Sequence, residues 1–210
     1  MPFALAQPFD IDDLCQTLKL QGFVYVSGLY PESTLDALYL EIKQHDEQYT
    51  LDIAGIGRGD DHTVLPAIRT DKIHWIDGSS SAQRAFLAQL ETLRCAINAR
   101  LLLGLFHTES HFAVYRTGDY YKRHVDSFKG QKNRILSMVT YLNPTWQATD
   151  GGLLHLYQSE QSPLPFISII PSWGTAVFFL SEEIPHEVSP SISHRYSIAT
   201  WFRCNSIIPV

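Results

Sequence analysis

The sequence predicts an α+β fold, a jelly-roll β-sandwich with N-terminal helices that support one of its sheets. Apolar residues recur at helical spacing in much of the first half of the chain. From His111 onward they alternate with the period of two that strands require. Turn-forming residues separate the later runs, as at Asn143-Pro144 and in the segment 150–152. Helices followed by a series of short strands are typical of this arrangement.

Three helices and two strands are predicted before His111. Asp10 and the aspartates after it offer an N-cap for a short helix that Gly22 ends. Loose helical spacing up to about His45 predicts a second amphipathic helix. Ser80 begins a third helix whose apolar face should pack on a sheet. The predicted helices lie around residues 14–20, 35–45 and 80–103, and the predicted strands are residues 23–26 and 71–76.

Strand-like runs then follow one another to the end of the chain. Each is short and is bounded by turn residues, which is the pattern of an all-β sandwich or jelly roll. The predicted strands are residues 111–116, 120–126, 134–142, 153–157, 166–170, 175–180 and 195–203.

The segment 54–70 differs in composition from its neighbours. It is charged and contains Gly55, Gly57 and Gly59. It is too long and too flexible in composition to be a simple connection. Both a mobile flap over a binding site and an ordinary surface loop fit this composition, so the sequence leaves the two interpretations open.

The composition is that of an ordinary globular protein. The 210 residues are 45% hydrophobic and 18% charged, and the net charge of −6 is spread along the chain. We therefore expect one domain over residues 1–210 and no nucleic-acid partner. Cys15, Cys95 and Cys204 lie far apart and form no Cys-x-x-Cys spacing, which favours a reducing cytoplasm. We recognise no signal peptide or membrane-spanning run, so we expect a soluble protein without a membrane partner.

Two histidines and one carboxylate form a candidate metal site. His124 and Asp126 are two residues apart, so in a strand their side chains leave the same face. His186 follows sixty residues after Asp126. Two imidazoles and one carboxylate on one face of an octahedral ion leave its other positions open, which is the ligand set of non-haem Fe(II) oxygenases. The histidines that we expect to be unrelated to the metal are His74, His111, His155 and His194.

Arg195 and Tyr141 are candidates for binding a carboxylate beside this metal. Arg195 opens the last strand, and Ser197 and Ala199 share its face, where small side chains leave space. The planar guanidinium of Arg195 can bind a carboxylate in a bidentate manner. By the same alternation Tyr141 brings a hydroxyl from a facing strand. A surface salt bridge for Arg195 and a core position for Tyr141 are the simpler interpretations of each residue alone, and the metal ligands favour the binding interpretation for both.

Together these motifs resemble the Fe(II)- and 2-oxoglutarate-dependent dioxygenases of the prolyl 4-hydroxylase type, in particular the oxygen-sensing prolyl hydroxylases and their bacterial relatives. The resemblance covers roughly residues 69–203. It rests on the motifs Ala113-Val-Tyr, Tyr121-x-Arg-His-Val-Asp, Tyr141-Leu-Asn-x-x-Trp, Gly151-Gly, Pro185-His-Glu-Val and Arg195-Tyr-Ser-Ile-x-x-Trp.

The resemblance implies a double-stranded β-helix with a catalytic core over residues 111–203 and a supporting part over residues 1–110. It implies that Fe(II) is bound by His124, Asp126 and His186, and that the distal carboxylate of 2-oxoglutarate is held by Arg195 and Tyr141. Residues implied to line the same pocket are Tyr115, Val139 and Trp201. Residues implied near a substrate-covering loop are Arg69, Asp71, Trp75 and Arg134.

The implied function is hydroxylation of a prolyl residue in a protein or peptide by O2. Succinate and CO2 would be released, and ascorbate would support turnover. Hydroxylation of a free amino acid or another small molecule by the same site stays open, since fold-level likeness does not select a substrate. A jelly-roll binding module without turnover is a further alternative. A halogenase is disfavoured because a halide needs the coordination position that Asp126 occupies.

We also expect Asp71 and Arg134 to approach one another at the pocket mouth. They would pair when the segment 54–70 closes over a peptide. An exposed ion pair contributes only about 0 to 1 kcal/mol, so this contact should bias the lid without stabilising the fold.

Overall fold

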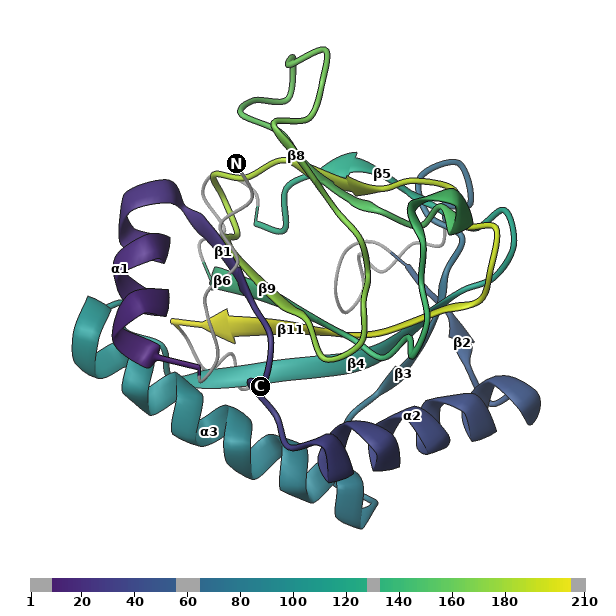
Figure 1. The fold of residues 1–210 in the computed structure, drawn as a ribbon, viewed down its shortest axis with the longest axis horizontal. Helices are drawn as coiled ribbons and strands as arrows, with labels where there is room; N and C mark the ends of the chain where they lie inside the picture. The colour runs from purple at the N-terminus through teal and green to yellow at the C-terminus, as the bar shows by residue number, and fades with distance from the viewer. Residues whose placement is uncertain (1–8, 56–64, 128–132, 205–210) are drawn as a thin grey trace, which may run out of the picture.

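The computed structural model describes residues 9–55, 65–127 and 133–204, which form two antiparallel sheets and three α-helices (Figure 1). The seven-stranded sheet has the order β1 (Phe23–Val26), β9 (Ala176–Leu180), β6 (Arg134–Tyr141), β11 (Arg195–Arg203), β4 (His107–Tyr115), β3 (Lys72–Trp75) and β2 (Asp52–Ile53). The four-stranded sheet has the order β5 (Tyr121–His124), β10 (His186–Val188), β7 (Leu154–Leu156) and β8 (Ile167–Ile169). The short 3-10 helix η2 (Ala148–Asp150) precedes β7.

Three helices support the seven-stranded sheet on the face opposite the four-stranded sheet (Figure 1). They are α1 (Ile11–Gln21), α2 (Glu32–Glu47) and α3 (Ser81–Leu101). Alternation along β4 separates two cores. Phe112 and Val114 join the core on the helix side, and Ala113 and Tyr115 join the core between the sheets. The seven-stranded sheet is therefore buried on both faces, and its inner face is available to build a site.

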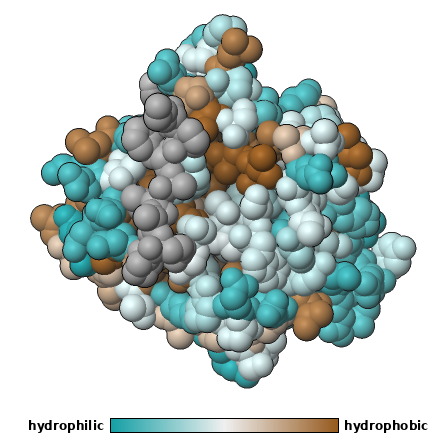
Figure 2. Space-filling view, in the orientation of Figure 1, coloured by the Kyte–Doolittle hydropathy of each residue, from teal (hydrophilic) through white to brown (hydrophobic). Residues whose placement is uncertain are grey.

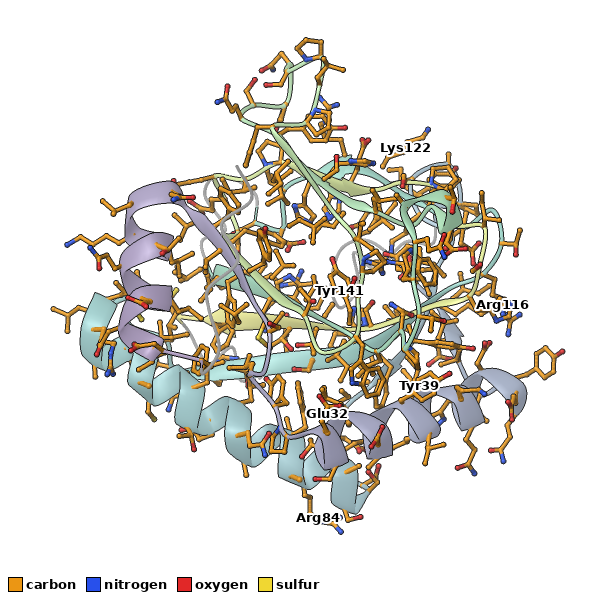
Figure 3. The ribbon with its side chains drawn as sticks, in the orientation of Figure 1. Glu32, Tyr39, Arg84, Arg116, Lys122 and Tyr141 are labelled. Atoms are coloured by element: carbon orange, nitrogen blue, oxygen red, sulfur yellow. The ribbon has the colours of Figure 1, made fainter. Side chains whose placement is uncertain are left out.

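The surface is that of an ordinary globular protein. Figure 2 shows mostly hydrophilic and weakly polar residues on one face, with hydrophobic residues in separate places. Figure 3 shows Arg84 and Lys122 at the periphery, whereas Tyr141 lies in the interior. Among the described residues, no helix has the length and apolarity needed to span a membrane.

The helix boundaries follow the capping signals in the sequence. The side chain of Asp10 accepts hydrogen bonds from the backbone N–H groups of Asp12 (2.7 Å) and Asp13 (3.3 Å) at the start of α1. Gly22 ends the helix with a φ of 75°, a left-handed conformation that glycine adopts without steric cost. Ser80 likewise caps α3, because its Oγ accepts from the backbone N–H of Gln83 at 3.0 Å.

Most predicted elements are present, and the clearest differences are in the strands. Strands β1 and β11 have the predicted bounds, but β4 begins at His107 rather than at His111. Strand β2 was missed because two residues cannot show an alternation, and β10 was missed because it begins with the polar residues His186 and Glu187 and has a single apolar residue. The predicted strand 120–126 was wrong at its end, since β5 stops at His124 and Asp126 lies beyond it.

Replacing the N-cap of α1 tests how capping stabilises the fold. We expect Asp10→Ala to lower the free energy of unfolding by about 1 kcal/mol, because two backbone donors lose their acceptor. Asp10→Asn keeps a side-chain acceptor and should stay close to the wild type. Urea unfolding measures both variants, and equal losses would assign the effect to the charge rather than to the cap.

Candidate active site

The three candidate metal ligands meet where β5 pairs with β10. His124 and His186 are direct partners across these two antiparallel strands. Asp126 lies two residues beyond the end of β5, and its backbone N–H donates to the carbonyl of Ser181 at 3.0 Å. Among the described residues, His124, Asp126 and His186 form the one group whose ligand atoms are close enough to hold a metal ion, all within 4.8 Å of one another.

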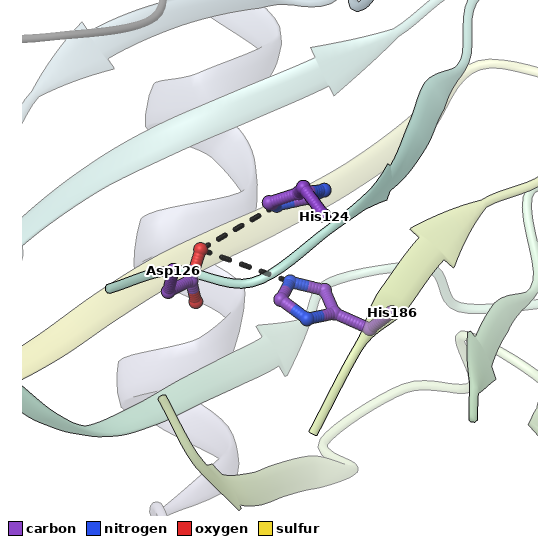
Figure 4. Close-up of side chains that lie close together, drawn as sticks. All are labelled: His124, Asp126 and His186. Carbon is purple, nitrogen blue, oxygen red and sulfur yellow. Dashed lines mark ion pairs between the residues drawn. The ribbon is translucent and has the colours of Figure 1, made fainter. Parts of the chain in front are cut away.

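The ligand atoms point toward a common centre (Figure 4). Asp126 Oδ1 lies 3.5 Å from His124 Nε2 and 3.7 Å from His186 Nε2. The other ring nitrogen of each histidine faces a carbonyl oxygen, that of Lys122 at 2.8 Å and that of Ile184 at 3.0 Å. Because a carbonyl oxygen can only accept, each Nδ1 must donate. In the neutral form, an imidazole held this way presents the lone pair of Nε2 to the centre, which is the tautomer that a metal needs.

The protonation states of the group suit a cation. Burial lowers the pKa of His186 to about 4, and the neighbouring His124 acts in the same direction. Burial alone would raise the pKa of Asp126, but His186 and His124 outweigh it and hold the pKa well below its usual range. At neutral pH, His186 is therefore a neutral ligand and Asp126 a charged one.

A cavity between the sheets continues from this group along the inner face of β11. Arg195, Ser197, Ala199 and Trp201 line it, as the alternation along β11 predicts, together with residues of the neighbouring strands. The register pairs Arg195 with Tyr115 and Ala199 with Val139 across the sheet, and both partners line the cavity. The small residues Ser197 and Ala199 thus lie between the three candidate metal ligands and the guanidinium of Arg195.

Arg195 is a buried cation with donors to spare. Its side chain is 1% exposed, and its guanidinium carbon lies 4.8 Å from the ring centre of Tyr115 and 5.0 Å from that of Tyr141. Nη1 donates to Ser197 Oγ at 3.1 Å. Within the described part of the chain, Arg195 Nε has no hydrogen-bond partner, and the hydroxyl of Tyr141 faces Arg195 without a hydrogen bond of good geometry. Buried donors without partners are costly, so these atoms indicate a polar ligand with acceptor oxygens.

The expected pair of Asp71 and Arg134 is wrong. Asp71 is fully buried, and Arg69 donates to it from Nε at 2.8 Å and from Nη2 at 2.6 Å. Arg134 instead donates to Glu109 from Nε at 2.9 Å and from Nη2 at 2.7 Å. Its guanidinium also stacks on Trp201 at 3.7 Å. Arg69 binds both carboxylate oxygens of Asp71, whereas Arg134 is held by one oxygen of Glu109 and by the ring of Trp201, so each group of the expected pair has a different partner.

The Arg69–Asp71 pair lies at the cavity rather than at an exposed hinge. Arg69 is 7% exposed, lines the cavity and lies over the ring of Tyr121 at 4.3 Å. Burial alone would lower the pKa of Arg69, but Asp71 outweighs it and raises the pKa above its usual range. Residues 56–64, which include Gly57, Gly59 and most of the predicted flap, lie outside the described residues. The flap interpretation therefore stays a prediction.

His111 is a cavity residue that the sequence reading missed. It is 2% exposed and lies between the rings of Trp75 and Trp201, each 5.2 Å away between ring centres. Burial lowers its pKa to about 4, with Arg69 acting in the same direction, so the ring is neutral at neutral pH. Among the described residues, it is not in the group of candidate metal ligands. His111 shares a face of β4 with Ala113 and Tyr115, and this alternation is the signal that could have placed it in the cavity.

Comparison with known proteins agrees with this geometry. Residues 110–203 match the model of the 2OG-Fe(II) oxygenase superfamily. The crystal structure of a Pseudomonas putida prolyl-4-hydroxylase is 35% identical, with a TM-score of 0.82 over 94% of this chain and 100% of that chain. The chain belongs to the 2OG-Fe(II) oxygenase superfamily. It is a dioxygenase of the prolyl 4-hydroxylase type, and the predicted jelly-roll fold is confirmed.

Two further members of this superfamily extend the likeness. A Trichoplax adhaerens prolyl hydroxylase, in complex with a hypoxia inducible factor oxygen degradation domain peptide fragment, is 25% identical with a TM-score of 0.82, over 92% of this chain and 88% of that chain. Human Egl nine homolog 1 is 32% identical over 145 residues. That match covers 64% of this chain and 33% of the human protein, so the chain spans about a third of this relative.

The buried pair of Arg69 and Asp71 gives a prediction about stability. We expect Asp71→Asn to lower the free energy of unfolding by about 3 kcal/mol, because Arg69 would stay buried with its charge uncompensated. Asp36→Asn, on an exposed position of α2, is the control and should change stability by no more than about 0.5 kcal/mol. Thermal unfolding measures both, and an unchanged melting temperature for Asp71→Asn would favour the exposed pair again.

Proposed function

We propose that this chain is a Fe(II)- and 2-oxoglutarate-dependent hydroxylase of a prolyl residue in a protein or peptide. One observation carries the proposal. A single cavity joins the His124, Asp126 and His186 group to the buried donors of Arg195, which lie beside Tyr141. The first group suits a divalent metal, and the second suits the far carboxylate of a dicarboxylic acid.

The donor set fits Fe(II). Two neutral imidazole nitrogens and one carboxylate oxygen would hold the ion from one side and leave its other positions open. The second nitrogen of each ring is held by a backbone carbonyl, which fixes the orientation of the ligands.

The opposite end of the cavity fits 2-oxoglutarate. Arg195 and Tyr141 would hold the distal carboxylate, since Arg195 Nε and the Tyr141 hydroxyl need acceptors. Ser197 and Ala199 are small enough to leave room for the carbon chain. Val139, Tyr115 and Trp201 also line this cavity and would enclose the co-substrate.

The protein's part in the reaction is to bind, orient and exclude water. When bound, iron and 2-oxoglutarate supply the oxidative chemistry, with release of succinate and CO2 and transfer of oxygen from O2 to a C–H group. Apolar side chains from both sheets line the cavity beside the ligand group, Leu154 and Val188 from the four-stranded sheet and Phe179 from the seven-stranded sheet. They keep the charged ends of the site in a medium where electrostatic interactions are strong.

The substrate class rests on weaker support than the co-substrate. The Trichoplax relative is seen with a peptide fragment, which supports a prolyl peptide here. Trp75 is 48% exposed and stands next to the cavity residue His111, so it offers an aromatic contact at the rim. Ascorbate support belongs to the proposal because of the family resemblance, and a cytoplasmic location fits the three free cysteines.

A mass-spectrometric assay tests the proposal. The protein is incubated with Fe(II), 2-oxoglutarate, O2 and proline-containing peptides, and succinate and peptide mass are followed together. We expect succinate and a peptide that gains one oxygen atom on proline, and neither product with Asp126→Ala. Oxidation of free amino acids alone would select a small-molecule hydroxylase. Absence of succinate under all conditions would favour a binding module.

Arg195→Lys tests the carboxylate site. A lysine keeps the charge but not the planar fork, so we expect the dissociation constant of 2-oxoglutarate to rise about tenfold or more. Calorimetric titration of the Mn(II)-loaded protein measures it without turnover. An unchanged dissociation constant would put the carboxylate elsewhere.

Gly152→Ala tests whether the position of Arg195 matters. A Cβ at Gly152 would lie 2.9 Å from Arg195 Cδ and 2.9 Å from Ser191 Oγ, at a φ of +60°. We expect severalfold weaker binding of 2-oxoglutarate in the same titration. Gly104→Ala is the matched control, since its φ is +65° and no atom lies within 4 Å of the added Cβ. An equal loss of binding in the two variants would mean that backbone strain, not Arg195, is responsible, and wild-type binding by Gly152→Ala would mean that the position of Arg195 does not matter.

A further inference from the structure

Two buried serines stand behind the carboxylate of Asp126. Ser137 lies on β6 and is 2% exposed, and Ser181 follows the end of β9 and is fully buried. Ser137 Oγ is 2.5 Å from Asp126 Oδ2 and 2.9 Å from Ser181 Oγ. The three side chains thus form a chain of hydrogen bonds that ends at a candidate metal ligand.

The direction of both hydrogen bonds is fixed by chemistry. The short contact is donated by Ser137, because the oxygens of an aspartate carboxylate are acceptors. Ser137 must therefore donate its single hydroxyl proton to Asp126 Oδ2. The remaining contact of Ser137 requires Ser181 to donate to it. Ser181 orients Ser137, and Ser137 orients Asp126.

The backbone of Asp126 is also hydrogen-bonded to Ser181. Its N–H donates to the carbonyl of Ser181 at 3.0 Å, and the N–H of Ser181 donates to the carbonyl of Ile135 at 3.1 Å. This matters because Asp126 lies beyond the end of β5 and has no strand partner in the described part of the chain. The ends of β6 and β9 therefore supply the support that β5 does not.

The two carboxylate oxygens have separate partners. Oδ1 faces His124 Nε2 and His186 Nε2, as the two dashed lines in Figure 4 show. Oδ2 faces Ser137. A carboxylate held only by its own chain could rotate and offer either oxygen or both. The bond from Ser137 leaves Oδ1 alone for the metal.

We propose that Ser137 is a positioning residue that holds Asp126 as a ligand through one oxygen, and that Ser181 supports it in series. This inference rests on the proposed function only in taking His124, Asp126 and His186 as a metal site. Hydrogen bonds to a metal ligand from outside the metal site commonly change metal affinity by about 10- to 100-fold when they are removed.

A buried serine elsewhere in the same sheet provides a matched control. Ser110 on β4 is 2% exposed, and its Oγ lies 2.8 Å from Thr200 Oγ1. By the alternation along β4 and β11, Ser110 and Thr200 share the helix-side face of the sheet with Phe112 and Phe202, and neither lines the cavity between the sheets. Ser110→Ala removes a buried hydroxyl of the same kind without touching Asp126.

The experiment measures metal binding without turnover. Mn(II) is titrated into each protein in the absence of 2-oxoglutarate, and free Mn(II) is followed by electron paramagnetic resonance. We expect Ser137→Ala to weaken Mn(II) binding by about tenfold or more, and Ser137→Thr to restore it because the hydroxyl returns. Ser181→Ala should have a smaller effect, and the double variant should match Ser137→Ala, because the two hydroxyls act in series. Ser110→Ala should bind as the wild type does.

Other outcomes are distinct. If the wild type binds Mn(II) and Ser137→Ala binds it with the same affinity, this inference is overturned and the proposed function still stands. An equal loss in Ser110→Ala would also overturn it, since any buried hydroxyl would then serve. Absence of Mn(II) binding by the wild type would overturn both. If Ser137→Ala does not fold, Ser137→Cys offers a similar volume with a weak donor and should show the same loss.

Discussion

The pairing of β5 with β10 is the constraint on which the candidate site depends. These are short strands, yet they set His124 directly opposite His186. Because side chains alternate between faces, a slip of one residue would turn one imidazole away from the cavity. Pairing of β10 with β7 on its other side, where His186 is opposite Leu156, adds a second fixed register. Backbone hydrogen bonds therefore position the two candidate histidine ligands.

The seven-stranded sheet then determines what lies next to the ligands. Its helix-side face is covered by apolar residues of α1, α2 and α3, so the sheet is supported from behind. Its inner face presents the small residues Ser197 and Ala199 between the metal group and Arg195. A buried guanidinium with unsatisfied donors is unfavourable by itself. A carboxylate that satisfies Arg195 and Tyr141 would relieve this cost, which couples co-substrate binding to the stability of the site.

The sequence predicted the faces of the long alternating strands well and the side-chain contact partners poorly. Strict alternation over nine residues made the inward face of β11, with Arg195 and Ala199, readable. β10 has a single apolar residue and shows no alternation, so its motif was noticed but the strand was not predicted. The partner of Asp71 was predicted wrongly because ion pairing depends on distances in space, which sequence spacing does not give. The actual partner, Arg69, is only two residues away in the chain. Ser137 and Ser181 carry no signal in sequence, since their contact with Asp126 exists only after three separate segments meet.

The most direct test of the central claim is an anaerobic titration of 2-oxoglutarate into the Fe(II)-loaded protein, followed by the visible charge-transfer absorption of a 2-oxo acid chelated to Fe(II). The account predicts that the band develops in the wild type and saturates with a single binding site. It also predicts that the band is absent when Fe(II) is omitted and in Asp126→Ala. A wild-type protein that binds Fe(II) but never develops the band, or an Asp126→Ala variant that develops it equally, would contradict the joining of the two halves of the cavity into one active site.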